Sequence, residues 1–328
     1  MTINPNKLVE LIHKTLSIKQ NAVWEARDFA RFLAEAAKCD TYLETMNSET
    51  MPNSDTLHYR IHQDVEINAL HNAFLSITKK CVRKLRRRKV IVIIDYTHEP
   101  FFGRTKNDWV HGYMPASGSR GSYRFLSASI VIDDKRYFVY GKPVNRITDE
   151  SFELLQILAQ IELLELKIEV VLLDRGFARS SENIAVLKDA GVKYLGLYQK
   201  YKNIKNIIKG TKRRYINRKF KVKGIPTRLV IGKKEIAWVF VTNMKFSVFE
   251  KYLKLYKKRW NIETGFRVHD EACIKTKSTD IRVRYFLFIA AMLLYNVWKY
   301  LDAKISFKRF VIQLWSGVDH VCKCRSQT

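Results

Sequence analysis

A seven-residue stretch, Lys89-Val-Ile-Val-Ile-Ile-Asp95, constrains the fold of this 328-residue chain most strongly. Its five apolar residues are all β-branched, and branching at Cβ stiffens χ1 and favours extended backbone. A short apolar run bounded by charged residues is typical of a central strand buried on both faces. Asp95 stands where we expect this strand to end, and sites in open α/β sheets form at the carboxyl ends of strands. An acid there can also cap a helix or a turn, so Asp95 alone does not define a site.

The segments after Asp95 predict a mixed sheet with helices packed on it. We expect a loop over 96–122, which is rich in Gly, Pro and Ser, followed by two strands joined by a turn at 133–136. A helix should then begin at Thr148-Asp-Glu, where a capping residue and acids suit a helix N-terminus. The expected elements are strands 123–132 and 137–144, helix 148–166, strand 167–174 ending in Asp174, helix 181–191 and strand 192–197. The order βββαβαβ predicts an α/β fold.

Helices are predicted on both sides of this region. Apolar residues recur at helical spacing through residues 1–80, where one expected helix covers 59–78. Late in the chain we expect a long helix over 247–273 and an apolar helix over 281–301. The apolar run in this last helix is shorter than the ~20 residues that a membrane span needs, which favours a buried helix.

The charge balance points to a polyanion as partner. The chain has 59 Lys and Arg against 32 Asp and Glu, a net charge of +27. A globular protein this basic typically faces nucleic acid, with an anionic membrane surface as the second candidate. The window 190–234 holds fifteen basic residues, no acid and several aromatics, which suits a groove for nucleic acid. A second basic run, over 79–89, is either a phosphate contact or a solvated linker.

Composition also indicates a compartment and a division of the chain. No secretory leader is visible at the start, and five cysteines without a framework spacing suit a reducing cytoplasm, so we expect a cytoplasmic protein. Cys322-Lys-Cys324 near His320 is a weak metal pattern. We expect a helical DNA-binding region (1–85), a catalytic region (86–302) with a small β-rich insertion over about 199–236, and a short tail (303–328).

Three carboxylates stand out as a candidate site: Asp95, Asp174 and Glu263. Tyr256 and Arg259 precede Glu263 at a spacing that places all three on one helix face, and Arg267 continues that stripe. Three acids beside a groove for a polyanion would repel each other unless a cation lay among them. Mg²⁺ prefers carboxylate, water and phosphate oxygens, and two such ions catalyse in-line phosphoryl transfer. The sequence has no phosphate-binding loop, dinucleotide fingerprint or paired Cys-x2-Cys motif that would indicate another chemistry.

These residues resemble the DDE transposases of bacterial and archaeal insertion sequences. The matching stretches are Val-Ile-Ile-Asp95-Tyr-Thr, Val-Leu-Leu-Asp174-Arg-Gly-Phe and Tyr256-Lys-Lys-Arg-Trp-Asn-Ile-Glu263, and the last fits the Tyr-x2-Arg-x3-Glu signature of one branch. The resemblance covers roughly residues 88–300. In that branch a lysine follows the glutamate after six residues, but here that position is Asp270, with Lys275 and Lys277 further on.

The resemblance implies a fold, an activity and a set of roles. The fold would be a ribonuclease-H-like mixed sheet flanked by helices. The chain would cleave DNA at transposon ends and join the 3′-hydroxyl to target DNA, with two Mg²⁺ ions (or Mn²⁺) on the three acids, and it would act as a homodimer on the double-stranded terminal repeats. Tyr256 and Arg259 would contact phosphates. The remaining expected DNA contacts are Arg267, Lys212, Arg213, Arg214 and Trp238, the last by stacking on a flipped base unless it is a core residue.

Other functions stay open on the sequence alone. A metal-dependent nuclease or resolvase would use the same three acids without strand transfer. A catalytically inactive derivative would only bind DNA, although all three acids and the Tyr–Arg pair are present. A membrane-surface binder would explain the charge but not the strands that end in acids, so no membrane partner is expected.

Overall fold

The structure, a computed structural model, describes residues 6–19, 21–39, 41–46, 48–104, 107–233, 236–270, 273–302 and 304–313, without the side chains of 260–270. At its centre is one mixed sheet with nine strands in the described ranges. Its first five long strands are β1 (Lys89–Phe101), β3 (Gly121–Ile132), β4 (Lys135–Val144), β5 (Lys167–Leu173) and β6 (Tyr194–Leu197). They lie in the order β4-β3-β1-β5-β6. The first three are antiparallel, whereas β5 and β6 run parallel to β1, so the expected βββαβαβ order and mixed α/β fold are observed.

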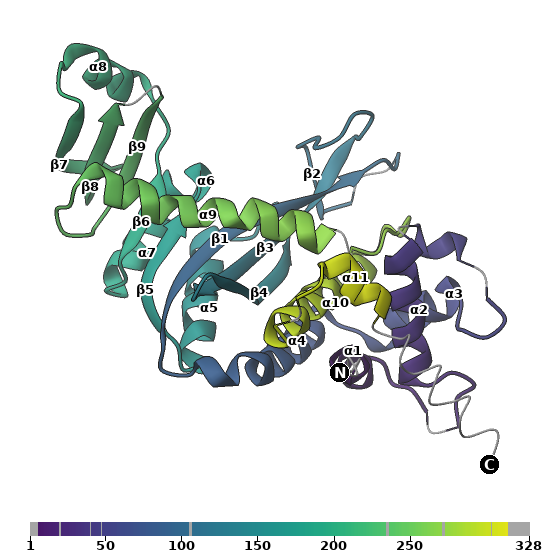
Figure 1. Cartoon of the computed structure of the whole chain (residues 1–328). Helices are drawn as coiled ribbons and strands as arrows, with labels where there is room; N and C mark the ends of the chain where they lie inside the picture. Colours follow the sequence, from purple (N-terminus) through teal and green to yellow (C-terminus); the bar gives the residue numbers. More distant parts are fainter. Residues whose placement is uncertain are drawn as a thin grey trace.

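The basic window continues this sheet. β9 (Ala237–Thr242) pairs antiparallel with β6, β8 (Ile225–Lys233) pairs with β9, and β7 (Tyr215–Val222) forms the outer edge, while α8 (Lys202–Gly210) packs at the far end (Figure 1). The β-rich insertion that the sequence predicts is therefore observed. Because they extend the sheet, the insertion and the acid-bearing strands share one continuous frame.

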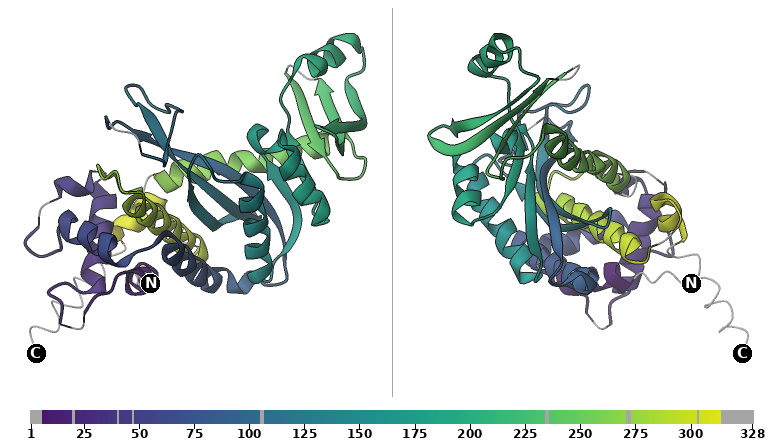
Figure 2. Two further views of the ribbon diagram at one scale, coloured as in Figure 1. Left: turned by 180° about the vertical axis from the view of Figure 1, so that it is seen from behind. Right: turned by 60° about the vertical axis from the view of Figure 1, so that its left-hand side comes forward.

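Helices cover both faces of the sheet, as alternation along β1 requires. Val90, Val92 and Ile94 face one side, where α5 (Glu150–Leu163) and α7 (Ser181–Asp189) pack. Ile91 and Ile93 face the other side, which α9 (Phe249–Asp270) crosses (Figures 1 and 2). The long helix α9 thus runs over the same sheet face from the insertion toward the other end of the molecule.

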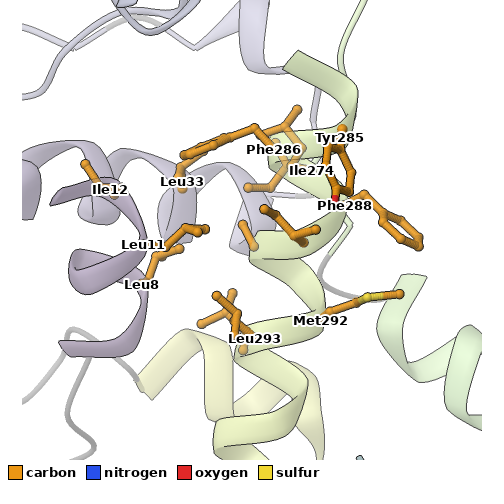
Figure 3. Close-up of a cluster of buried hydrophobic side chains, with 14 of the residues drawn as sticks. Leu8, Leu11, Ile12, Leu33, Ile274, Tyr285, Phe286, Phe288, Met292 and Leu293 are labelled. Carbon is orange, nitrogen blue, oxygen red and sulfur yellow. The ribbon is translucent and has the colours of Figure 1, made fainter. Parts of the chain in front are cut away.

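The N-terminal helices surround α10 (Ile281–Tyr300). They are α1 (Asn6–Thr15), α2 (Ala26–Cys39), α3 (Ser54–Asp64) and α4 (Ile67–Val82), with α11 (Phe307–Gln313) beside them. Figure 3 shows Leu8, Leu11 and Leu33 directed at Phe286 and Leu293 of α10. α10 is the one described helix long and apolar enough to cross a membrane, but most of it is buried in this core, which agrees with the expected buried helix.

Two expected elements are wrong. The predicted helix over 59–78 is two helices, because Val65 and Glu66 adopt extended backbone between α3 and α4. Val65 is buried at this break, and Asp64 accepts a hydrogen bond from the backbone N of Ser17, so tertiary contacts hold a bend that neither Gly nor Pro marks.

The weak metal pattern of the tail, Cys322, Cys324 and His320, lies outside the described residues.

The predicted loop over 96–122 is also wrong, because β1 continues to Phe101 and pairs with β3 as far as Gly121. β2 (Val110–His111) adds a short partner on the same end of β3. Pairing of β1 with β5 stops at Ile93, so the later part of β1 has a free edge, where Pro100 is tolerated. Asp95 therefore lies within a strand, at the point where the parallel part of the sheet ends.

Candidate active site

Asp95 and Asp174 lie side by side at the carboxyl edge of the parallel strands. In the β1–β5 register, Ile93 is opposite Leu172. Asp95 follows Ile93 by two residues, and Asp174 follows Leu172 by two residues. Ile93 and Leu172 both belong to the apolar cluster under α9. Side chains alternate between the faces of a strand, which places Asp95 on the α9 face. Asp174 lies just beyond β5, and the charges of both acids act on the buried Tyr256 of α9. The two strands that the sequence singled out thus bring their terminal acids to one place.

Asp174 is also a helix cap. Its Oδ1 accepts a hydrogen bond of 2.8 Å from the backbone N of Phe177, in the first turn of α6 (Arg175–Ala178). Gly176 leaves room around the carboxylate, because a Cβ at that position would stand 3.3 and 3.4 Å from its two oxygens. This cap uses one oxygen of Asp174 and fixes the carboxylate in place.

Asp95 is bound by an arginine from α9. Arg259 Nη2 donates to Asp95 Oδ2 at 2.6 Å, with the two side chains only 11% and 17% exposed. The other oxygen, Oδ1, accepts from the backbone N of Tyr96 at 2.9 Å. A second guanidinium, that of Arg136 on β4, is buried, and burial lowers its pKa to about 10 while the charge of Asp95 opposes that shift. Positive charge thus gathers around Asp95.

Tyr256 presents an unused hydroxyl to this site. It lies one turn before Arg259 on α9 and is fully buried, and within the part of the chain that the structure describes its hydroxyl has no hydrogen-bond partner. Burial raises the pKa of Tyr256 to about 12, and the charges of Arg259, Asp174 and Asp95 act on it as well. A buried hydroxyl without a partner costs about 1–3 kcal/mol of folding free energy. An acceptor on a bound ligand would therefore remove this cost.

The other residues that we expect to contact DNA lie at increasing distances from the two acids. Trp238 of β9 is half-buried and packs on Phe240, with ring centroids 6.0 Å apart, and edge-on to Tyr256 at 6.5 Å. The exposed Lys212, Arg213 and Arg214 precede β7, which is five strands from β1, or about 24 Å across the sheet. They can touch a long ligand that passes the acids but not the acids themselves.

Some predicted residues cannot be placed. The backbone of α9 continues through Glu263, Arg267 and Asp270, but the side chains of all three lie outside the described residues. The basic run over 79–89 is at the opposite end of β1 from Asp95. There Arg86 pairs with Glu165 and Arg88 pairs with Asp133, so this run is not part of the acid site.

Sequence reasoning missed Arg136, which the structure adds to the surroundings of Asp95. The available signal was a buried-strand pattern, Tyr137-Phe-Val-Tyr, that begins directly after an arginine.

The sequence profile of the transposase DDE domain matches residues 86–297. The chain belongs to the DDE transposase family. No curated protein matches it significantly. Among solved structures, the piggyBac transposase in its cryo-EM synaptic complex with hairpin DNA is similar, with a TM-score of 0.64 and 12% identity over 95% of this chain and 79% of that one. At this identity the likeness shows the fold, and it confirms the expected ribonuclease-H-like architecture.

The acids of this transposase fit the divalent cations on which its family generally depends. Asp95 and Asp174 offer hard carboxylate oxygens on neighbouring strands, and Mg²⁺ is typically held by one or two carboxylates together with water and substrate phosphate. Among the described side chains, which exclude Glu263, no cluster of three or more His, Cys, Asp or Glu could hold a metal. The predicted third ligand is Glu263, which lies one turn beyond Arg259 on α9.

Proposed function

We propose that this transposase cleaves DNA at transposon ends and joins the freed 3′-hydroxyl to target DNA, using two Mg²⁺ ions on Asp95, Asp174 and Glu263. Mn²⁺ would substitute for Mg²⁺. The observation that carries the proposal is that Asp95 and Asp174 each follow the last β1–β5 pair by two residues and lie near α9, next to an arginine and an unpartnered tyrosine hydroxyl. Bound divalent ions would activate the attacking hydroxyl and stabilise the leaving oxygen.

The protein side chains then bind and orient the phosphate. With a cation held by Asp95, Arg259 would no longer have to balance that charge alone, and its planar guanidinium would be available to bind a DNA phosphate. Tyr256, one turn earlier on α9, donates its unused hydroxyl to the same phosphate group. Asp174 keeps its position through the bond with Phe177 N while its other oxygen remains available as a ligand.

Double-stranded DNA is the proposed partner, and several features support it. The chain has a net charge of +27, and the similar piggyBac structure is a complex with DNA. The insertion forms a groove of about 710 Å³ lined by Lys219, Lys221, Arg228 and Lys245, which we assign to the transposon end. Because transposition requires two ends to be brought together, we propose a homodimer on DNA.

A cleavage and strand-transfer assay tests this proposal. Asp95→Asn, Asp174→Asn and Glu263→Gln should each abolish cleavage of the native element ends in Mg²⁺, with DNA binding nearly unchanged. Asp133→Asn, which alters an exposed acid at the opposite end of β1, is the matched control and should remain active. Full cleavage by all three site variants would refute the assignment. Cleavage without joined products would indicate a nuclease or resolvase, and no cleavage by the unaltered chain would indicate a protein that only binds DNA.

A further inference from the structure

A cavity of about 450 Å³ lies beyond the C-terminal end of α9, separate from the acids and from the insertion. Four parts of the chain line it: Tyr42 in the N-terminal region, residues 99–103 at the tip of β1, the extended segment 273–279, and Arg284 of α10. Its volume is within the range of about 300–1,000 Å³ typical of small-ligand sites. We infer that this cavity binds one unstacked nucleotide of the DNA strand that leaves the active site.

The walls of the cavity are fixed by hydrogen bonds. On one side, the backbone N of Leu43 donates to Lys275 O at 2.8 Å, and Glu44 accepts from the backbone N of Lys277 at 2.9 Å. On the other side, Arg284 donates to Ser278 O at 2.7 Å and to Glu99 Oε2 at 3.0 Å. Since the cavity is held from both sides, it is formed before any ligand arrives, which lowers the entropic cost of binding.

The cavity offers the groups that recognise a nucleotide. Phe102 and Tyr42 line it and are 55% and 40% exposed, so a base has ring faces to stack on. The largely buried Glu99–Arg284 pair, with side chains 20% and 10% exposed, places a polar donor and acceptor where a base edge could reach them. Lys277 adds positive charge, with its Nζ 5.6 Å from the centre of the Tyr42 ring.

The segment 273–279 presents its lysines to one side. Ile274 and Thr276 are buried, whereas Lys275 and Lys277 between and after them are exposed, the alternation of a strand. Two lysines spaced about 6.6 Å apart along an extended backbone can follow the phosphates on either side of a nucleotide. In the sequence, Asp270 stands where the family motif has a lysine, and Lys275 and Lys277 had no assigned role. Contact with these phosphates would give them one.

The cavity is also in reach of the acids. α9 leads from Arg259 to Asp270 and ends shortly before the segment 273–279, on the side away from the insertion (Figure 1). Eleven helical residues cover about 16 Å, the rise of about five stacked nucleotides. A strand bound at Arg259 can therefore place a nucleotide near its end in the cavity. This inference rests on the proposed function, because it needs DNA at the active site.

The test compares two fluorescein-labelled DNA duplexes of the native element end, one fully paired and one with a single extrahelical nucleotide close to the cleavage site, in EDTA. Fluorescence anisotropy gives the dissociation constants without any cleavage. Base stacking on aromatic side chains contributes about 1–3 kcal/mol, so the unaltered chain should bind the extrahelical duplex about 5- to 150-fold more tightly. Duplexes with the extra nucleotide at each of the first several positions locate the preferred one.

Tyr42→Ala and Phe102→Ala should each reduce this preference several-fold while leaving the affinity for the fully paired duplex unchanged. Phe152→Ala, which removes an equally exposed aromatic from α5 on the opposite sheet face, is the control and should keep the preference. The double variant Lys275→Ala, Lys277→Ala should lower the salt dependence of binding by about two phosphate contacts.

The outcomes separate the two claims. Equal binding of both duplexes by the unaltered chain, or an unchanged preference in both aromatic variants, would overturn the nucleotide cavity and leave the proposed transposase function intact. Failure to bind either duplex would overturn both.

Discussion

The hydroxyl of Tyr256 gives the sharpest test of the site, because its removal should change stability and activity in opposite directions. In Tyr256→Phe the ring stays buried and only a hydroxyl without a described partner is lost. Relief of that desolvation should stabilise the DNA-free protein by about 1 kcal/mol. For a chain of this length, with an unfolding entropy of about 2 cal/mol/K per residue, the melting temperature should rise by about 1.5 °C.

Activity should fall in the same variant. A hydrogen bond to a charged phosphate contributes about 1.5–3 kcal/mol, so cleavage of the element end should slow by about 10- to 100-fold. Urea unfolding monitored by fluorescence measures the stability, and single-turnover cleavage in Mg²⁺ measures the activity.

Tyr252→Phe is a matched control on the same face of α9. Tyr252 is equally buried, but its hydroxyl donates to Lys245 O at 2.7 Å. Its removal should destabilise the protein by about 1 kcal/mol, because the carbonyl loses its partner. The reasoning is refuted if the two variants lose stability alike, or if Tyr256→Phe cleaves DNA at the original rate.

Three further perturbations have defined outcomes. Arg259→Gln removes one positive charge from the carboxylate of Asp95, so DNA-free protein should bind Mn²⁺ more tightly in an electron paramagnetic resonance titration, yet cleave DNA more slowly; weaker Mn²⁺ binding would contradict this. Asp174→Asn keeps an acceptor for the α6 cap, whereas Asp174→Ala removes it and should lose about 1 kcal/mol of stability in urea unfolding. Both variants should be inactive, and equal stability of the two would argue against the cap. Burial lowers the pKa of His71 to about 4, below that in the unfolded chain, so the unfolded state binds more protons as the pH falls below about 6.5. Stability should therefore drop by about 2 kcal/mol between pH 7 and pH 5, and His71→Gln should show a smaller drop in urea unfolding at the two pH values.

The sequence predicted those parts of the fold that local patterns encode. An unbroken β-branched run located β1, a mostly apolar run located β5, and the acid that follows each run located Asp95 and Asp174. The loop expected after Asp95 was wrong because polar residues such as Thr97 and Glu99 interrupt the apolar pattern, whereas their strand state depends on pairing with residues about 25–30 positions later. The break at Val65 was missed because it comes from packing, and no Gly or Pro marks it.

Contacts between distant residues were beyond a single sequence. Helical spacing placed Tyr256 and Arg259 on one face of α9, but the partner of Arg259 is 164 positions away. The same applies to α10, whose composition predicted burial without saying that α1 and α2 would cover it. The sequence thus supplied the chemistry of the candidate site, while the strand register and the placement of α9 supplied its geometry.

The ion pair of Arg259 with Asp95 explains how such a site can fold before it meets metal or DNA. Two carboxylates held in register at a sheet edge would repel each other and weaken the fold if nothing balanced them. Here one is balanced by a guanidinium and the other accepts a backbone hydrogen bond at a helix N-terminus, where negative charge is favoured. Neither interaction blocks the role proposed for its acid. The guanidinium of Arg259 can also bind a phosphate, and Asp174 retains a second oxygen that the cap does not use. The contacts that stabilise the DNA-free protein therefore also hold Arg259, Asp95 and Asp174 close to the positions that their proposed roles on DNA require.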